Sequence, residues 1–138
     1  PGTAFVVPIA QITQPDKSVV DTLPFFGRLT KAPVPPNLCG FFDSSAGTGK
    51  EADAVPELPP NYPTNVDQRV GFTGGLHSEN VKEWLSRYEK SARQHGCLLL
   101  SDCQSGFRQN RKRGEPADPV ELLKIGAAVR EWVAALKW

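Results

Sequence analysis

The sequence predicts a single α+β domain, in which a proline-rich, extended N-terminal half with short strands packs on a C-terminal helix–strand–helix unit. Eleven of the 13 prolines lie within the first 63 residues, where apolar residues come in short runs. Residues 76–138 instead show two helical patterns with start and stop signals. A chain of 138 residues has the size of one domain. We therefore expect one domain over 1–138, with an extended half at 1–75 and a helical half at 76–138.

The N-terminal half predicts short extended segments joined by irregular chain. Ala4–Val7 and Ile9–Ile12 are rich in β-branched residues but are separated by Pro8, which favours an edge strand or an extended arm. Val19–Val20 is a further candidate strand. Proline and glycine punctuate residues 32–63, which predicts a long irregular connection that acts as a strap or an arm. Six apolar residues would anchor such a strap on a core: Leu38, Phe41, Phe42, Val55, Leu58 and Tyr62.

The first helical pattern begins near residue 80. Its apolar face has the spacing of an amphipathic helix and consists of Val81, Trp84, Leu85, Tyr88 and Ala92. Ser78 or Asn80 is placed to cap its start, and Asn80 with Glu83 has the spacing of a capping box. Gly96 stands where a left-handed residue ends a helix.

A short strand and a second helix follow. The apolar run Cys97–Leu100 predicts a buried strand. Asp118 as N-cap, Pro119 as the first helical residue and Glu121 predict a helix start. The expected buried face consists of Leu122, Ile125, Val129, Trp132, Val133 and Leu136. Gly126 lies on that face, which suggests close approach of a neighbouring backbone.

A basic tract between the strand and the second helix carries the first functional hypothesis. It consists of Phe107, Arg108, Arg111, Lys112 and Arg113. Cationic side chains neutralise phosphates, and an adjacent aromatic ring can stack on an unpaired base. We therefore expect a non-enzymatic binding module that contacts the backbone of RNA or DNA. Two competing interpretations stay open: a solvated loop without a ligand, or a loop whose arginines pair with Glu115 and Asp118.

Two other functions stay open at this stage. A structural or assembly protein would dock its proline-rich N-terminal arm on a partner subunit or on a second copy. A small metal-dependent hydrolase or nuclease would use carboxylates near the basic tract, where Asp102, Glu115 and Asp118 occur. No complete catalytic motif is present, and no cofactor is implied.

Histidine and cysteine supply weak metal candidates. His95, Cys97 and Cys103 lie close together in sequence, with His77 further away. Their spacing matches none of the usual pairs of zinc ligands. We therefore expect core or helix-end roles for them and assign no metal.

The segment Ser45–Lys50 resembles a phosphate-binding loop only at first sight. Ser44 stands where the first glycine of the motif belongs, and Glu51 replaces its Ser or Thr. No strand signal is evident before it, so we interpret the segment as a turn.

Charge, cysteine content and the length of apolar runs indicate the compartment in which the protein works. The net charge is +1, with an excess of two acidic residues over 1–75 and of three basic residues over 76–138. Three cysteines do not suit a secreted disulfide scaffold. No apolar run approaches the roughly 18 residues of a membrane span. These features favour an intracellular protein that does not enter a membrane.

Overall fold

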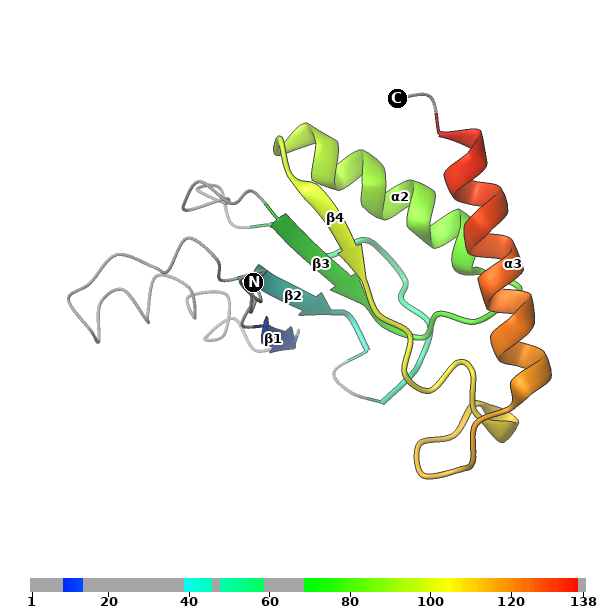
Figure 1. The fold of residues 1–138 in the computed structure, drawn as a ribbon. Helices are drawn as coiled ribbons and strands as arrows, with labels where there is room; N and C mark the ends of the chain where they lie inside the picture. The colour runs from blue at the N-terminus through cyan, green and yellow to red at the C-terminus, as the bar shows by residue number, and fades with distance from the viewer. Residues whose placement is uncertain (1–8, 14–38, 46–47, 59–68, 137–138) are drawn as a thin grey trace, which may run out of the picture.

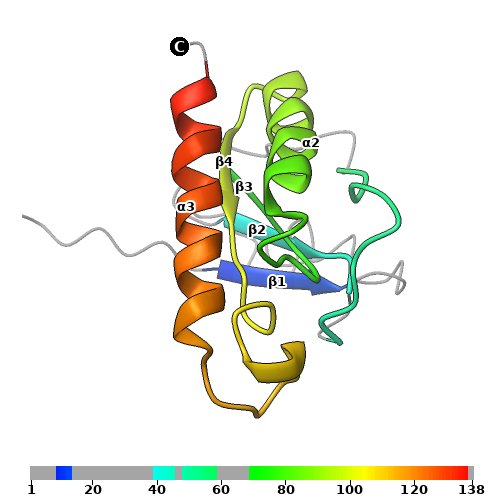
Figure 2. The same cartoon turned by 90° about the vertical axis from the view of Figure 1, so that its right-hand side faces the viewer.

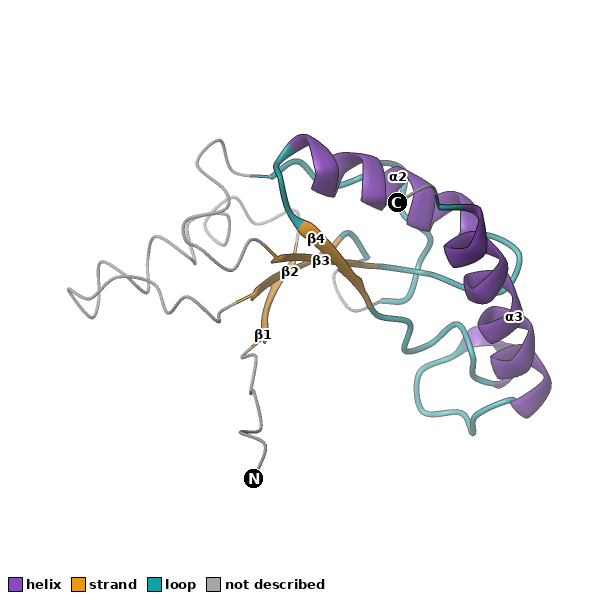
Figure 3. Cartoon of the chain, turned by 45° about the horizontal axis from the view of Figure 1, so that its top comes forward, coloured by secondary structure: helices purple, strands orange, loops and turns teal. Residues whose placement is uncertain are grey.

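The fold is an open parallel sheet with two helices on one side of it (Figures 1 and 3). The computed structural model describes residues 9–13, 39–45, 48–58 and 69–136. The strands are β1 (Ile9–Thr13), β2 (Cys39–Asp43), β3 (Arg69–Thr73) and β4 (Leu98–Ser101). The helices are α2 (Val81–Gln94) and α3 (Pro119–Ala135), with a 3₁₀ turn η1 (Gln109–Arg111) before α3. The predicted mixture of helices and strands is confirmed.

The sheet has the strand order β1-β2-β3-β4, and every neighbouring pair is parallel. Asp43 is level with Thr73, and Phe72 is level with Ser101. A sheet of this kind gathers the carboxyl ends of its strands at one edge, which is where open parallel sheets usually bind ligands. The loops after β2, β3 and β4 therefore begin beside one another.

The structure corrects the prediction of an irregular connection over 32–63. Cys39–Asp43 within that range form β2, a central strand between β1 and β3. Phe41 and Phe42 are 7% and 1% exposed. Pairing on both sides satisfies the backbone of this short strand, although Pro35 and Pro36 precede it closely. β1 (Ile9–Thr13) is the first strand in the sheet order, which agrees with the edge strand, one of the two alternatives predicted for Ile9–Ile12, while Ala4–Val7 and Val19–Val20 lie outside the described residues.

The core lies between the sheet and α2. The buried residues of α2 are the five predicted ones, Val81, Trp84, Leu85, Tyr88 and Ala92. The ring of Tyr88 stacks on Phe72 of β3 with 4.9 Å between centroids, and the ring of Trp84 lies 5.5 Å from that of Tyr88. The helical spacing therefore identified the packed face correctly.

Asn80 stabilises the entry to α2 differently from the predicted capping box. It occupies the N-cap position, but its side chain makes no capping hydrogen bond. Its Oδ1 accepts from the N–H of His77 at 2.8 Å, and its Nδ2 donates to the carbonyl of Gly75 at 3.1 Å. Asn80 thus braces the turn between β3 and α2. At the other end Gly96 has φ +65°, as predicted.

The strand predicted at Cys97–Leu100 exists as β4, but it is not a buried strand. β4 is the last strand in the sheet order, and the side chain of Leu98 is 65% exposed. An apolar run does not distinguish an edge strand from a central one, because the position in the sheet depends on distant segments.

The start of α3 is confirmed. The Asp118 carboxylate accepts hydrogen bonds from the N–H groups of Val120 at 2.9 Å and Glu121 at 3.2 Å. Pro119 is the first helical residue, as expected.

The predicted buried face of α3 is confirmed only in part: Ile125 is buried, and Val129 and Trp132 are half-buried. Within α3, Ile125 is the only residue that the structure buries, whereas Leu122 and Val133 are 52% and 43% exposed. A Cβ on Gly126 would meet no atom within 4 Å, so the expected backbone approach is absent. The cause is the position of α3, which lies beside α2 at the β4 side of the sheet (Figures 1 and 2). Within the described ranges, no helix combines the length and apolar character needed to cross a bilayer.

Glu121 ties the start of α3 to the start of α2. Its Oε1 accepts a hydrogen bond from the N–H of Ser78 at 3.0 Å, and its side chain is 13% exposed. The hydrogen bonding to Ser78, together with the charges of Lys124 and Arg111, lowers the pKa of Glu121. Because its folded-state pKa lies below the unfolded one, this stabilisation is complete above about pH 5 and is lost as the pH falls through the folded-state pKa.

We expect Glu121→Gln to lower the free energy of unfolding at pH 7 by roughly 1 kcal/mol. The variant should also lose less stability than the unaltered chain between about pH 5 and pH 3. Denaturant unfolding over a pH series measures both effects. Glu115→Gln is the matched control, since the Glu115 carboxylate forms no hydrogen bond or ion pair with a described residue. The same acid sensitivity in Glu121→Gln and the unaltered chain would contradict this role.

Candidate nucleic-acid interface

The basic tract forms a loop, here called the basic loop (residues 107–113), between β4 and α3 (Figure 2). Its first residues are held by backbone hydrogen bonds to the chain before α3: the Gln109 N–H donates to the Pro116 carbonyl at 3.0 Å, and the Asp118 N–H donates to the Phe107 carbonyl at 2.7 Å. Asn110 and Arg111 both have φ of +54°, which turns the chain sharply. The surface loop predicted here is confirmed.

Arg108 is held in place by its neighbours. Its Nη1 donates to the carbonyl of Glu115 at 2.6 Å, and its guanidinium lies 5.7 Å from the centroid of the Phe107 ring. Its Nε is buried and has no hydrogen-bond partner among the described residues. Arg108 is therefore an oriented cation whose buried Nε donor is unused, and Phe107 is half-buried beneath it.

The other three cations of the loop divide into two kinds. Arg111 donates to Glu79 at 3.0 Å, a pairing that the sequence did not indicate. Lys112 and Arg113 are exposed, and neither forms an ion pair with any residue in the described ranges. The arginines do not pair with the carboxylates of Glu115 and Asp118, whereas the exposure of Lys112 and Arg113 agrees with the other competing interpretation, a solvated loop.

A polar cavity of about 750 Å³, here called the edge cavity, opens at the carboxyl edge of the sheet beside the basic loop. The strand arrows in Figure 1 point toward the side on which this loop lies. The lining comes from the ends of β2, β3 and β4, from the loops that follow them, and from Arg108 and Arg113 of the basic loop. Residues distant in sequence therefore meet at one polar opening.

Hydrogen bonds order the strand ends around the edge cavity. Asp43 is 4% exposed, and its Oδ1 accepts from the backbone N–H of Ser45 at 2.9 Å and from its hydroxyl at 2.7 Å. The hydroxyl of Thr73 donates to the carbonyl of Asp102 at 2.9 Å, which joins the ends of β3 and β4. Asp102 itself is exposed.

Sequence reasoning missed most of this lining. The segment Ser45–Lys50 was interpreted as a turn without a preceding strand, whereas β2 ends at Asp43 immediately before it. The signal was the run Gly40–Asp43 followed by small hydroxyl and glycine residues. A similar run, Val70–Thr73, precedes Gly74 and Gly75, which also line the cavity.

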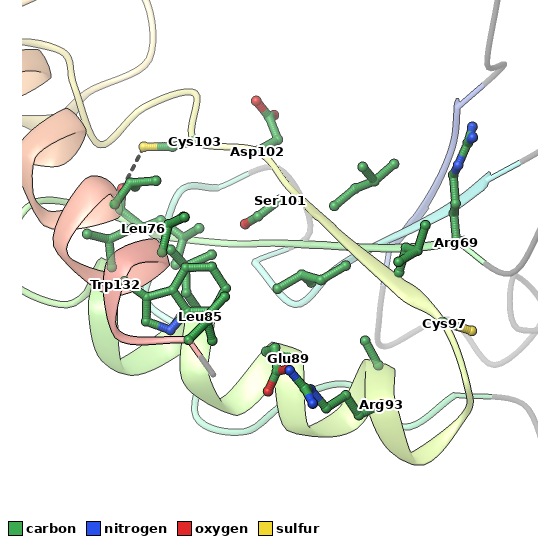
Figure 4. A pocket seen from close by; sticks show the side chains of 18 of the residues that line it. Arg69, Leu76, Leu85, Glu89, Arg93, Cys97, Ser101, Asp102, Cys103 and Trp132 are labelled. Atoms are coloured by element: carbon green, nitrogen blue, oxygen red, sulfur yellow. Dashed lines mark hydrogen bonds and ion pairs between the residues drawn. The ribbon is translucent and has the colours of Figure 1, made fainter. Parts of the chain in front are cut away.

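A second cavity, of about 810 Å³, is apolar and lies between β4, α2 and α3 (Figure 4). Leu76, Leu85 and Trp132 line it near α3, while Arg69 and Cys97 lie at its other end (Figure 4). It exists because α3 buries little of its apolar surface against β4.

The weak metal candidates are not brought together. His95 and Cys97 precede β4, whereas Cys103 follows it at the opposite end. His95 Nδ1 lies 3.0 Å from the carbonyl of Ser91, and the Cys103 thiol donates to the carbonyl of Leu76 at 3.0 Å. The part of the chain that the structure describes holds no group of three or more His, Cys, Asp or Glu residues able to bind a metal ion.

The hydrolase hypothesis gains no support from these positions. Asp118 caps α3, and Glu115 acts through its backbone carbonyl, so Asp102 alone of the three acidic residues lines the edge cavity. Burial raises the pKa of the Cys103 thiol, which keeps it in the less nucleophilic protonated form.

The described part of the proposed strap packs on its own domain. Ala52 is buried in the core, with Val55 and Leu58 packed against it. The Trp84 indole donates to the Glu51 carboxylate at 3.0 Å. The other residues proposed for an N-terminal arm, including Leu38 and Tyr62, lie outside the described residues, so docking on a partner stays a prediction.

Neither a protein-family model, nor a curated protein, nor a solved structure matches this chain. Fold and site alone therefore define its class. It is an open parallel-sheet domain with a polar cavity at the carboxyl edge and a basic loop beside that cavity.

Proposed function

We propose that this chain is a non-enzymatic binding module that contacts the backbone of RNA or DNA through the basic loop. The observation that carries the proposal is the pair Lys112 and Arg113, which is exposed and without a carboxylate partner in the described ranges. Charges of this kind are available to phosphates without the cost of breaking an existing ion pair.

The remaining cations would support this pair. The Arg111–Glu79 ion pair joins side chains that are 44% and 73% exposed. Exposed pairs contribute about 0–1 kcal/mol, so a phosphate can displace Glu79 at little cost. Arg108 is already oriented by the Glu115 carbonyl, and the Arg108 guanidinium lies over one face of the Phe107 ring. Stacking of a base on Phe107 would therefore be secondary to phosphate contact.

The geometry favours backbone contact over base recognition. Sequence is usually read by a helix or strand placed in a groove, whereas phosphate contacts need only exposed donors. The basic loop is irregular apart from the three residues of η1. Binding should therefore depend weakly on sequence.

We expect Lys112→Ala/Arg113→Ala to weaken binding of a mixed-sequence single strand on the order of 20-fold in about 0.1 M salt, since two phosphate contacts are lost. Fluorescence anisotropy with a labelled oligonucleotide measures the affinity. Lys90→Ala/Arg130→Ala is the matched control, because it removes the same charge from exposed positions on the helices. If both double variants weakened binding equally, the loss would come from the lower net charge and not from the basic loop, and this would contradict the proposal.

A further inference from the structure

The edge cavity presents cationic and anionic groups from different segments. Arg108 and Arg113 come from the basic loop, whereas Asp43 and Asp102 come from the ends of β2 and β4. A ligand that satisfies both must itself carry an anion and hydrogen-bond donors. The polar lining therefore specifies more than a simple phosphate site.

The cationic groups have donors to spare. The buried Nε of Arg108 has no partner in the part of the chain described, although its Nη1 is held by the Glu115 carbonyl. Arg113 forms no ion pair with a described residue, and the hydroxyl of Ser105 likewise donates to none. Guanidinium groups bind phosphate oxygens through charge-assisted hydrogen bonds, and an adjacent hydroxyl adds a neutral one.

The anionic groups are acceptors. Asp43 is 4% exposed and its Oδ1 is engaged by Ser45, so this carboxylate orders the end of β2, and Asp102 is the acceptor offered to a ligand. Asp102 is exposed, and the Thr73 hydroxyl holds its backbone, so its carboxylate stays available. Paired hydroxyl groups of a sugar are donors that suit carboxylates of this kind, as in the ribose contacts of open parallel-sheet domains.

The cavity also has the right size. Its volume of about 750 Å³ lies within the roughly 300–1,000 Å³ that small-molecule sites occupy. A free phosphate ion would fill a small part of it, whereas a nucleotide would extend from the basic loop to the strand ends.

We propose that the edge cavity binds a ribonucleoside 5′-phosphate, with the phosphate at Arg108 and Arg113 and the ribose hydroxyls at Asp102. The inference rests on the proposed function for its choice of a nucleotide as the phosphate ester. It adds that the phosphorylated end of an RNA strand enters the cavity, while the following backbone crosses the basic loop at Lys112.

The test is isothermal titration of the full chain with AMP, deoxy-AMP and adenosine. AMP should bind about tenfold or more tightly than adenosine, because adenosine lacks the phosphate. AMP should also bind about tenfold more tightly than deoxy-AMP, since an acceptor left without its hydroxyl donor is penalised. Equal affinity for AMP and adenosine, or no binding of AMP, would overturn the proposal. Equal affinity for AMP and deoxy-AMP would overturn the ribose assignment.

Single substitutions test which residues contact the ribose and which contact the phosphate. Asp102→Ala should lower AMP affinity to that of deoxy-AMP, and Arg113→Ala should lower it about tenfold without changing adenosine binding. Lys112→Ala is the control, since Lys112 does not line the edge cavity. It should leave AMP affinity unchanged and weaken only the oligonucleotide.

The same measurements separate the two proposals. Binding of AMP without binding of oligonucleotide would contradict the proposed function and support the cavity assignment. Binding of oligonucleotide without AMP would support the proposed function and overturn the cavity assignment.

Discussion

Tyr88→Phe is expected to leave the free energy of unfolding unchanged or to raise it, whereas Tyr88→Ala should lower it by about 3–5 kcal/mol. The ring of Tyr88 is 0% exposed and packs between Phe72 and Trp84, so its removal leaves a large cavity. The hydroxyl is different, because it is buried without a hydrogen-bond partner in the described part of the chain. A buried hydroxyl without a partner costs free energy, which its deletion recovers.

Denaturant unfolding of the two Tyr88 variants and the unaltered chain measures these differences. Burial raises the pKa of Tyr88, and the charges of Asp43 and Glu51 raise it further, so the hydroxyl stays protonated at neutral pH. A loss of more than about 1 kcal/mol in Tyr88→Phe would mean that the hydroxyl makes a stabilising hydrogen bond.

Gly106→Ala is expected to destabilise the fold by about 3 kcal/mol and to disturb the basic loop. A Cβ at this position would overlap the backbone carbonyl oxygen of Leu76 and would lie 3.0 Å from Sγ of Cys103. A backbone carbonyl cannot rotate away as a flexible side chain can. The segment leading to Phe107 would therefore have to move away from the turn after β3.

Gly126→Ala is the matched control for this prediction. Its Cβ would meet no atom within 4 Å, and the residue lies inside α3. Alanine there should raise stability by about 1 kcal/mol through helix propensity alone. Thermal unfolding compares the variants, and a Gly106→Ala protein as stable as the unaltered chain would contradict the close packing at residue 106.

The sequence predicted those elements whose signals are local. The apolar spacing from Val81 to Ala92, the cap at Asp118 and the glycine at residue 96 each act within one or two helical turns, and all are confirmed. The exposure of Leu122 and Leu98 could not be predicted in this way. It depends on where α3 and β4 lie relative to the sheet, which no local pattern contains.

The candidate site also has a part that local sequence predicts and a part that depends on distant segments. A run of cations is visible in any sequence, so Arg108 to Arg113 could be named as a basic loop. The pairing of Arg111 with Glu79 joins residues 32 positions apart. The edge cavity likewise needs the parallel order of the strands, which brings Asp43 and Asp102 to one edge. A short central strand within a proline-rich segment concealed that order.

The dependence of oligonucleotide affinity on salt tests the phosphate-contact proposal most directly. Plotted as log affinity against log salt, binding of a single strand should fall linearly, and Lys112→Ala/Arg113→Ala should make the slope shallower by about 1.4. The control Lys90→Ala/Arg130→Ala should keep the original slope. A slope unchanged by removal of Lys112 and Arg113, or an affinity independent of salt, would contradict phosphate contact through the basic loop.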